Sequence, residues 1–267
     1  MIPMFRQVTD QMGRMINVPA VPKRIVSLVP SQTELLYDIG LVDEVVGQTL
    51  FCIHPGHMHR TKPRVGGTKN FSIQKIRDLQ PDLIIGNKEE NDKERIEALQ
   101  AEFPVWMSDI QNLDDSLSMI VQIGELVGKK DEAAALYNTI SQSFGALHTE
   151  ATGTRVLYLI WRNPWMAAGH HTFIHDMLLR CGFSNVLVDT FARYPELSAE
   201  QIHQLNPQVI LLSSEPYPFK QIHADELNAL VPSAQILQVD GELFSWYGSR
   251  LMHSVRYFSD LLQHINR

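Results

Sequence analysis

The stretch Ser72-Ile-Gln-Lys-Ile-Arg-Asp-Leu-Gln-Pro-Asp-Leu-Ile-Ile85 returns later in the chain as Ser198-Ala-Glu-Gln-Ile-His-Gln-Leu-Asn-Pro-Gln-Val-Ile-Leu211. Ser, Ile, Leu, Pro and Ile keep their places in both copies. Each copy predicts a short helix, a proline that ends it, and a buried strand. Two copies predict two lobes of similar construction, and a cleft between two lobes is a common place for a ligand.

The segments around the two copies also correspond. The apolar run Arg24–Val29 predicts a buried strand, and Arg155–Ile160 repeats it in the second half. In the same way Ile236–Asp240 repeats Val105–Asp109. The alternation of strands and helices predicts an α/β fold in which each Rossmann-like lobe contains a parallel sheet.

The middle of the chain has no strand pattern. Asp114 and Asp115 predict the start of one helix that runs towards Gly128. A longer helix is predicted from Lys129 to about Glu150, and its length predicts a single rigid backbone helix between the lobes. The expected division is therefore an N-terminal lobe at 1–112, a helical linker at 113–151 and a C-terminal lobe at 152–267.

Composition excludes several classes of protein. The 267 residues are 44% hydrophobic and 20% charged, and the formal net charge is −7. This composition is typical of a globular protein, and without a block of Lys and Arg no nucleic-acid partner is expected. No apolar run reaches the ~18 residues that a membrane span needs. Cys52 and Cys181 form neither a disulfide framework nor a metal motif, and we expect both to be buried free thiols.

The first ten residues, Met1–Asp10, lack the apolar core and the cleavage site of a secretory signal. The chain as written is therefore expected in the cytoplasm, and in the periplasm or at the cell surface if an export signal precedes it. A monomer is expected.

The loops after the parallel strands are the expected ligand-binding segments, because ligands bind beyond the carboxyl ends of such strands. Three of the four tryptophans fall in the second-lobe loops, where exposed aromatic side chains indicate contact with a ligand. The candidate ligand-binding residues are Ser31, Gln32, Phe51, His54, Lys69, Asn87, Glu89, Trp161, Trp165, His170, Arg193, Tyr194, Tyr217, Phe244, Trp246 and Tyr247.

Two alternatives involve a metal or catalysis. His54, His57 and His59 form a cluster that could suit a free metal ion, but an exposed polar loop is the favoured interpretation. A chelatase-like enzyme would use His54 or His170 with Glu89 or Glu215. The chain has no dinucleotide, nucleophile-elbow or zinc-protease motif, and Gly66–Lys69 lacks the spacing of a phosphate loop. We therefore expect recognition without catalysis.

The chain resembles a known family of proteins. Several segments are similar to the helical-backbone (class III) substrate-binding proteins of ABC importers: Val8–Arg14, Pro22–Ser31, Thr33–Leu36, Val65–Gly67 and Leu79–Ile85. Others resemble the branch of that family that binds vitamin B12: Cys52–Pro55, Gly66–Asn70, Asn87–Asn91 and Phe244–Arg250. The resemblance covers nearly the whole chain.

The resemblance implies a non-catalytic solute-binding protein with no intrinsic cofactor. Its ligand would be a metal chelate in the cleft between the lobes, with cobalamin or another corrinoid first and haem or a ferric siderophore as alternatives. The ligand would be captured for uptake through an ABC permease or for carriage inside the cell. In this family each lobe offers a surface Glu to the permease; Glu200 matches, but Gln74 replaces the first-lobe Glu.

Overall fold

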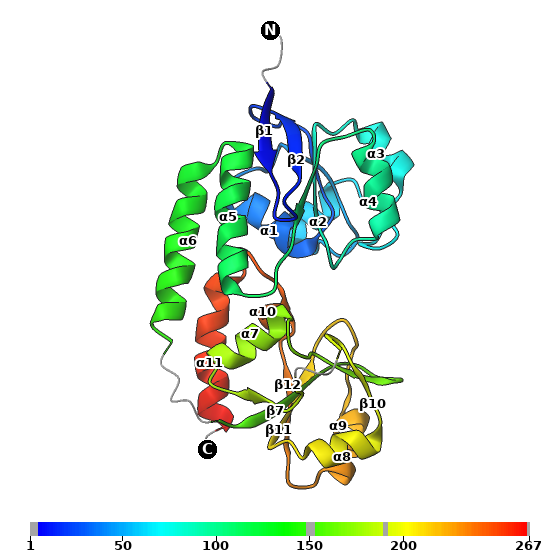
Figure 1. Cartoon of the computed structure of the whole chain (residues 1–267), viewed down its shortest axis with the longest axis vertical. Helices are drawn as coiled ribbons and strands as arrows, with labels where there is room; N and C mark the ends of the chain where they lie inside the picture. The colour runs from blue at the N-terminus through cyan, green and yellow to red at the C-terminus, as the bar shows by residue number, and fades with distance from the viewer. Residues whose placement is uncertain (1–4, 148–152, 189–191, 266–267) are drawn as a thin grey trace. The chain divides into compact units, whose positions relative to one another are not determined.

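The computed structural model describes residues 5–147, 153–188 and 192–265, which form two compact units (Figure 1). The first unit consists of the residues up to Ile110 together with Asp114–Ser141 and Tyr247–Arg250. The second unit contains Gln111–Leu113, Gln142–Trp246 and the residues from Leu251 onward. Each unit therefore includes residues that lie far apart along the chain.

A parallel sheet of four strands forms the centre of the first unit, as the sequence predicts. Its spatial order is β4-β3-β5-β6, with β3 at Ile25–Ser27, β4 at Val45–Gln48, β5 at Leu83–Asn87 and β6 at Val105–Ser108. Nearly all of these residues are buried, as expected for parallel strands that are covered on both faces.

Four helices connect these strands: α1 (Pro30–Asp38), α2 (Gly56–Thr61), α3 (Ile73–Leu79) and α4 (Lys93–Gln100). The helix α2 contains His57 and His59, where the sequence analysis considers a polar loop. Its residues are all exposed or half-buried, so no apolar periodicity marks it in the sequence.

A β-hairpin precedes the sheet, and the sequence analysis does not predict it. Strand β1 (Phe5–Thr9) pairs antiparallel with β2 (Met15–Pro19). Gly13, with φ of 75°, lies in the turn that joins them. Apart from the buried Val18, the residues of the two strands are exposed or half-buried, so the apolar signal of a buried strand is missing.

The duplicated stretch folds in the same way in both units. Ser72 caps α3 and Ser198 caps α8 (Ala199–Leu205), each by accepting a hydrogen bond from a backbone N–H three residues on. Both helices end at a residue in the left-handed conformation, Gln80 with φ of 46° and Asn206 with φ of 44°.

An arginine at the start of the central strand β3 or β7 connects each sheet to the helix of the duplicated stretch. Arg24 donates hydrogen bonds to the carbonyls of Leu79 and Gln80 at the end of α3. Arg155 donates to the carbonyl of Leu205 at the end of α8. A cation at the carboxyl end of a helix complements the partial negative charge there. The similarity between the units therefore extends from the sequence to specific contacts.

The sheet of the second unit is mixed, whereas the sequence predicts a parallel one. The strands β7, β11 and β12 are parallel, and β9 pairs in parallel with β7. The strand β8 runs antiparallel to both of its neighbours, β7 and β10. The short turn between Trp161 and Trp165 explains the difference, because a parallel crossover needs a dozen or more residues. The strands are β7 (Arg155–Trp161), β8 (Trp165–Ala167), β9 (Ser184–Asn185), β10 (Glu196–Leu197), β11 (Val209–Ser213) and β12 (Gln235–Val239).

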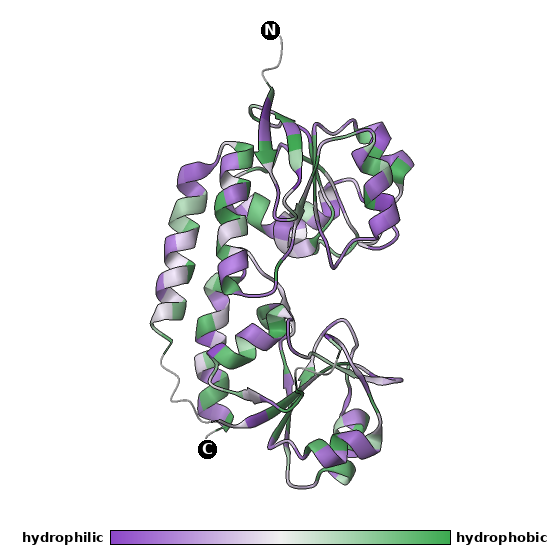
Figure 2. Ribbon diagram, in the orientation of Figure 1, coloured by the Kyte–Doolittle hydropathy of each residue, from purple (hydrophilic) through white to green (hydrophobic). Residues whose placement is uncertain are grey.

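The second unit contains further helices besides α8. They are α7 (Phe173–Arg180), α9 (Gln221–Leu230), α10 (Glu242–Ser245) and α11 (Leu251–Ile265). Hydrophobic residues line one side of α11 and hydrophilic residues the other (Figure 2). Its buried side chains, such as Leu251, Phe258 and Leu262, recur at helical spacing and face the core.

The predicted helices of the middle segment are α5 (Leu113–Val127) and α6 (Lys130–Gly145), separated by Gly128 with φ of 75°. The helix expected to reach Glu150 ends at Gly145, and the positions 148–150 lie outside the described residues. Residues of α6 contribute to both units, since the division falls after Ser141.

Each unit has its own hydrophobic core. Val26, Ile84 and Val105 from three strands contribute to the first core. Leu157 and Ile210 contribute to the second. In the described part of the chain, every helix is too short or too polar to cross a membrane.

Candidate ligand-binding site

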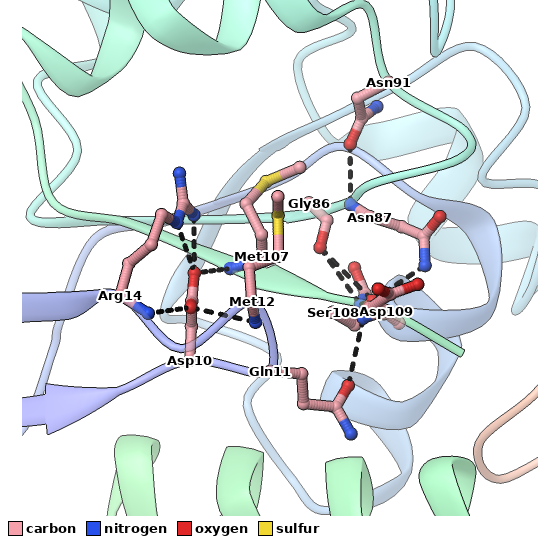
Figure 3. Close-up of polar contacts among 11 residues, drawn as sticks. Asp10, Gln11, Met12, Arg14, Gly86, Asn87, Asn91, Met107, Ser108 and Asp109 are labelled. Atoms are coloured by element: carbon pink, nitrogen blue, oxygen red, sulfur yellow. Dashed lines mark hydrogen bonds and ion pairs between the residues drawn. The ribbon is translucent and has the colours of Figure 1, made fainter. Parts of the chain in front are cut away.

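The carboxyl edge of the first sheet is held by a network of buried polar side chains (Figure 3). The side-chain oxygen of Asn87 accepts hydrogen bonds from the backbone N–H groups of Glu89 and Glu90, at 2.8 and 3.0 Å. Its amide nitrogen donates to Ser108 Oγ at 2.9 Å, and its own backbone N–H donates to Asn91 Oδ1 at 2.8 Å. Asn87 therefore fixes the turn that follows β5.

Gln32 extends this network from helix α1. Its Nε2 donates to Ser108 Oγ at 2.6 Å and to the carbonyl of Gly86 at 3.3 Å. Gln32, Ser31 and Asn87 are buried. The structure thus places these three candidate residues inside the unit, where Gln32 and Asn87 position the loops.

Asn91 and Lys69 connect two loops at this edge. The Asn91 amide donates to the carbonyls of Leu28 and Thr68, at 3.3 and 3.0 Å. The exposed Lys69 donates to the backbone carbonyl of Glu89. Sequence reasoning includes Lys69 and Glu89 among the candidates but misses Asn91, although an Asn directly after a polar turn is a typical turn-forming residue.

The loop after β4 exposes three large apolar side chains. Leu50, Phe51 and Ile53 are 48%, 57% and 42% exposed. Gly67 lies beneath the Phe51 ring, because a Cβ on Gly67 would stand 3.3 Å from Phe51 Cε2. Apolar side chains grouped on one exposed loop indicate a surface that another molecule covers.

Cys52, between Phe51 and Ile53, points inward. Its Sγ lies 3.0 Å from Thr33 Oγ1 and 3.1 Å from Thr49 Oγ1. Burial raises the pKa of the Cys52 thiol to about 11, and burial also raises the pKa of Cys181. Both cysteines are free and buried, which confirms the prediction.

Because the thiolate is the reactive form, neither cysteine should react quickly with iodoacetamide in the folded protein at about pH 8. Both should react once the protein is unfolded in urea. Mass spectrometry of the intact chain checks this result. Fast modification of the native protein would contradict the buried placement of these thiols.

The histidine cluster does not form a metal site in this structure. His57 and His59 lie on α2, and His59 Nδ1 is 3.1 Å from the carbonyl of Cys52. His54 is half-buried in the preceding loop. Within residues 5–147, 153–188 and 192–265, no group of three or more His, Cys, Asp or Glu side chains is placed to hold a metal ion.

The segment Tyr247–Arg250 is bound into the first unit by polar contacts. Tyr247 donates a hydrogen bond to Glu90 Oε1 at 2.8 Å, and Gly248 N donates to Ser116 Oγ at 3.2 Å. Arg250 forms two parallel hydrogen bonds with Glu34, at 2.6 and 2.8 Å, and both of these side chains are mostly buried. Burial, followed by the Glu90 charge, raises the pKa of Tyr247. The candidate Tyr247 is thus a buried tyrosine with a partner in its own unit.

Aromatic side chains gather at the carboxyl edge of the second sheet. The rings of Trp161 and Tyr217 meet edge to face at 5.3 Å, and Tyr217 contacts Phe219 at 4.9 Å. Trp161 is 39% exposed and Tyr217 is half-buried. These two rings follow β7 and β11, so they lie where the sequence analysis expects a ligand.

Two other candidate aromatic residues pack in the hydrophobic interior instead. Trp165 is buried and stacks on Phe219 at 6.2 Å, with the Arg162 guanidinium 4.3 Å from the centre of the indole ring. Phe244 is fully buried against Tyr158 and Phe258. An aromatic residue in a loop can pack inward as readily as outward, and the sequence does not distinguish the two.

Glu215, which the sequence analysis names only as an acid of the chelatase alternative, lies at the same edge. Glu215 Oε1 accepts hydrogen bonds from Ser245 Oγ at 2.9 Å and from the candidate Trp246 Nε1 at 2.8 Å. Burial raises the pKa of Glu215, and the neighbouring charges of Glu242 and Asp240 raise it further. The side chain of Trp246 is therefore buried, and its indole N–H donates to the Glu215 carboxylate.

The remaining second-unit candidates occupy the loops around α7. His170 stacks on His175 at 4.1 Å, and its Nε2 is 2.8 Å from the carbonyl of Leu187. Arg193 Nε donates to the carbonyl of His171 at 2.7 Å, and its guanidinium lies 5.9 Å from the centre of the Tyr194 ring. Among the candidates, Phe51 and Trp161 are exposed and Tyr217 is half-buried at the carboxyl edges, and the rings of His170 and Tyr194 are half-buried as well.

Comparison with known proteins identifies the family. Residues 25–235 match the profile of the family described as periplasmic binding protein. A vitamin B12-binding protein of Pectobacterium carotovorum subsp. carotovorum (strain PC1) is 24% identical over 239 residues, which cover 87% of this chain and 86% of that protein.

Two solved structures share the fold. The periplasmic vitamin B12-binding protein BtuF of Vibrio cholerae has a TM-score of 0.72 and 23% identity, over 92% of this chain and 98% of that one. The periplasmic heme-binding protein RhuT from Roseiflexus sp. RS-1 has a TM-score of 0.77 and 22% identity, over 91% and 97%. Because the family profile spans most of the chain, the resemblance seen in the sequence is confirmed: this protein belongs to the periplasmic binding protein family.

Proposed function

We propose that this protein is a non-catalytic receptor that binds a metal chelate with a large ring or several chelating arms, most of all a corrinoid such as cobalamin. Haem and ferric siderophores are the alternative ligands. The observation that carries the proposal is the set of exposed apolar and aromatic side chains at the carboxyl edges of the two sheets, represented by Phe51, Trp161 and Tyr217. Flat, partly apolar ligands are bound by such side chains, while a few polar groups fix their orientation.

Relatives and structural neighbours support the same class of ligand. The curated relative from Pectobacterium carotovorum is named for vitamin B12, and one of the two structural neighbours is named for heme. A free metal ion is disfavoured, since His54, His57 and His59 do not converge on one position.

A thermal-shift titration tests the proposal. Cyanocobalamin, hemin and a ferric hydroxamate are each added to the purified protein, with zinc chloride as the bare-ion control. A chelate present at 100 times its dissociation constant should stabilise the fold by about 2.7 kcal/mol. No shift with any chelate would refute the proposal, and a shift with zinc alone would favour the bare-ion alternative.

We further propose delivery to an ABC permease, with Glu200 as a docking residue. Glu200 is exposed, and its Oε1 accepts a hydrogen bond from Gln204 at 3.2 Å. At the matching position the exposed Gln74 donates to Asp78 at 2.8 Å, so in that helix the carboxylate lies one turn further on. Uptake of the chelate by cells that carry Glu200→Ala should fall, and unchanged uptake would argue against docking at this residue. Uptake requires the protein to act outside the inner membrane, whereas intracellular carriage would not.

A further inference from the structure

Glu215 occupies a defined position at the carboxyl edge of the second sheet. It follows β11, two residues before the aromatic Tyr217 in the same loop. Gly241 allows the loop after β12 to approach closely, since a Cβ there would lie 2.9 Å from Glu215 Cγ. Any larger side chain at position 241 would move the loop after β12 away from Glu215.

The hydrogen bonds that Glu215 accepts are on one of its two carboxylate oxygens. The Ser245 hydroxyl and the Trp246 indole both donate to Oε1, and within the described residues the structure gives no hydrogen bond to Oε2. The side chain is half-buried rather than enclosed. The contacts fix the direction of the carboxylate and leave Oε2 able to accept a hydrogen bond from another molecule.

The surroundings of Glu215 are acidic. The charges that act on it are those of Glu242 on α10 and Asp240 after β12, and both raise its pKa. The Glu215 charge also acts on the phenol of Tyr158 on β7, whose pKa is raised mainly by burial. Tyr257 on α11 lies beside Asp240, whose backbone N–H donates to its hydroxyl at 2.9 Å. A ligand carboxylate brought to this place would meet like charges, whereas an amide N–H or a cation would find an acceptor.

We propose that Glu215 determines specificity in the receptor, by accepting a hydrogen bond from an amide or another donor of the ligand and by excluding ligands that present a carboxylate there. The inference rests on the proposed function, and it narrows the ligand class. Corrinoids present a rim of carboxamide groups, whereas haem presents two carboxylates. The acid at this edge therefore favours the corrinoid over haem.

The experiment compares two ligands with the same macrocycle. The purified full chain is titrated with cyanocobalamin and with its monocarboxylic acids, in which one side-chain amide has been hydrolysed. The wild-type protein should prefer the amide form by about tenfold at neutral pH for at least one of these acids, the scale of one charge-assisted hydrogen bond. This preference should shrink as the pH falls through the raised pKa of Glu215, because the protonated carboxyl no longer repels the ligand carboxylate.

The variant Glu215→Gln keeps a carbonyl oxygen for Ser245 and Trp246 but removes the charge. It should bind both forms of that ligand equally within about twofold, while circular dichroism shows that it is folded. The matched control Glu242→Gln removes one negative charge at the same edge and should keep most of the preference. A preference that survives in Glu215→Gln, or that disappears equally in Glu242→Gln, overturns the role of Glu215.

Other outcomes separate this inference from the proposed function. If the wild-type protein binds hemin and no corrinoid, the role of Glu215 is overturned while the chelate receptor stands. If it binds neither hemin, cyanocobalamin nor a ferric hydroxamate, both are overturned.

Discussion

Replacing Asp10 by Ala should lower the free energy of unfolding by about 3 kcal/mol, within the range measured for breaking a buried charged contact. Asp10 is buried and accepts hydrogen bonds from the backbone N–H groups of Met12 and Arg14, at 3.0 and 2.9 Å, and from the Arg14 guanidinium (Figure 3). It also accepts from the buried backbone N–H of Met107 in β6, at 3.3 Å. Alanine would leave these donors without their acceptor, and an orphaned buried N–H alone costs about 1–3 kcal/mol.

Asp10 also joins the hairpin to the edge of the first sheet. The backbone N–H of Gln11 donates to the carbonyl of Met107 at 3.2 Å, and the Gln11 side-chain oxygen accepts from the backbone N–H of Asp109 at 3.3 Å. We therefore expect Asp10→Ala to release the hairpin from the edge strand. In hydrogen exchange, the amides of Met12, Arg14 and Met107 should lose protection first.

Urea denaturation of the full chain measures the loss of stability, and hydrogen exchange followed by NMR locates it. The control is Asp38→Ala, which removes an exposed aspartate on α1 and should change stability by less than about 0.5 kcal/mol. A loss below about 1 kcal/mol for Asp10→Ala, or unchanged protection at Met107, would show that the network is not a major source of stability.

The fold can be predicted from the sequence where its signals are local. In each copy of the duplicated stretch a serine cap, a left-handed helix end and an apolar strand lie within fourteen residues, and each is a property of neighbouring residues. The contact of Asp10 with Met107 joins positions that are far apart in the chain, so no local sequence pattern indicates it. The antiparallel turn between Trp161 and Trp165 escapes prediction because the repeat leads to the expectation of a second parallel sheet.

The sequence predicts which segments of the chain form the candidate site better than it predicts which of their side chains are exposed. Parallel strands place the correct loops at the carboxyl edges, and Phe51, Trp161 and Tyr217 are found there with exposed or half-buried surface. Trp165 and Phe244, which the sequence assigns to loops, lie in β8 and α10 and are buried, because tertiary packing decides which way an aromatic side chain faces. The sequence indicates Glu215 only as a chelatase acid, because its position depends on hydrogen bonds from Ser245 and Trp246 at the end of α10.

Replacing Trp161 by Ala should weaken chelate binding by about 30-fold, or roughly 2 kcal/mol, as is typical when a partly exposed aromatic anchor is removed. The ring follows β7 and rests edge to face on Tyr217, so its orientation is fixed before a ligand arrives. A ring fixed in advance loses little conformational entropy on binding. For the same reason Tyr217→Phe, which keeps the ring and removes only the hydroxyl, should change affinity by less than about threefold.

Isothermal titration with whichever chelate gives the largest thermal shift measures these affinities. The matched control is Phe5→Ala, which removes a 61% exposed aromatic side chain from β1, outside the loops after the strands, and should leave affinity unchanged. Equal losses for Trp161→Ala and Phe5→Ala would mean that the effect is not local to the binding surface. If Trp161→Ala binds as well as the wild type while Phe51→Ala does not, the first unit alone would supply the aromatic contact. Because Phe51 belongs to the first unit and Trp161 to the second, each substitution tests the contribution of its own unit.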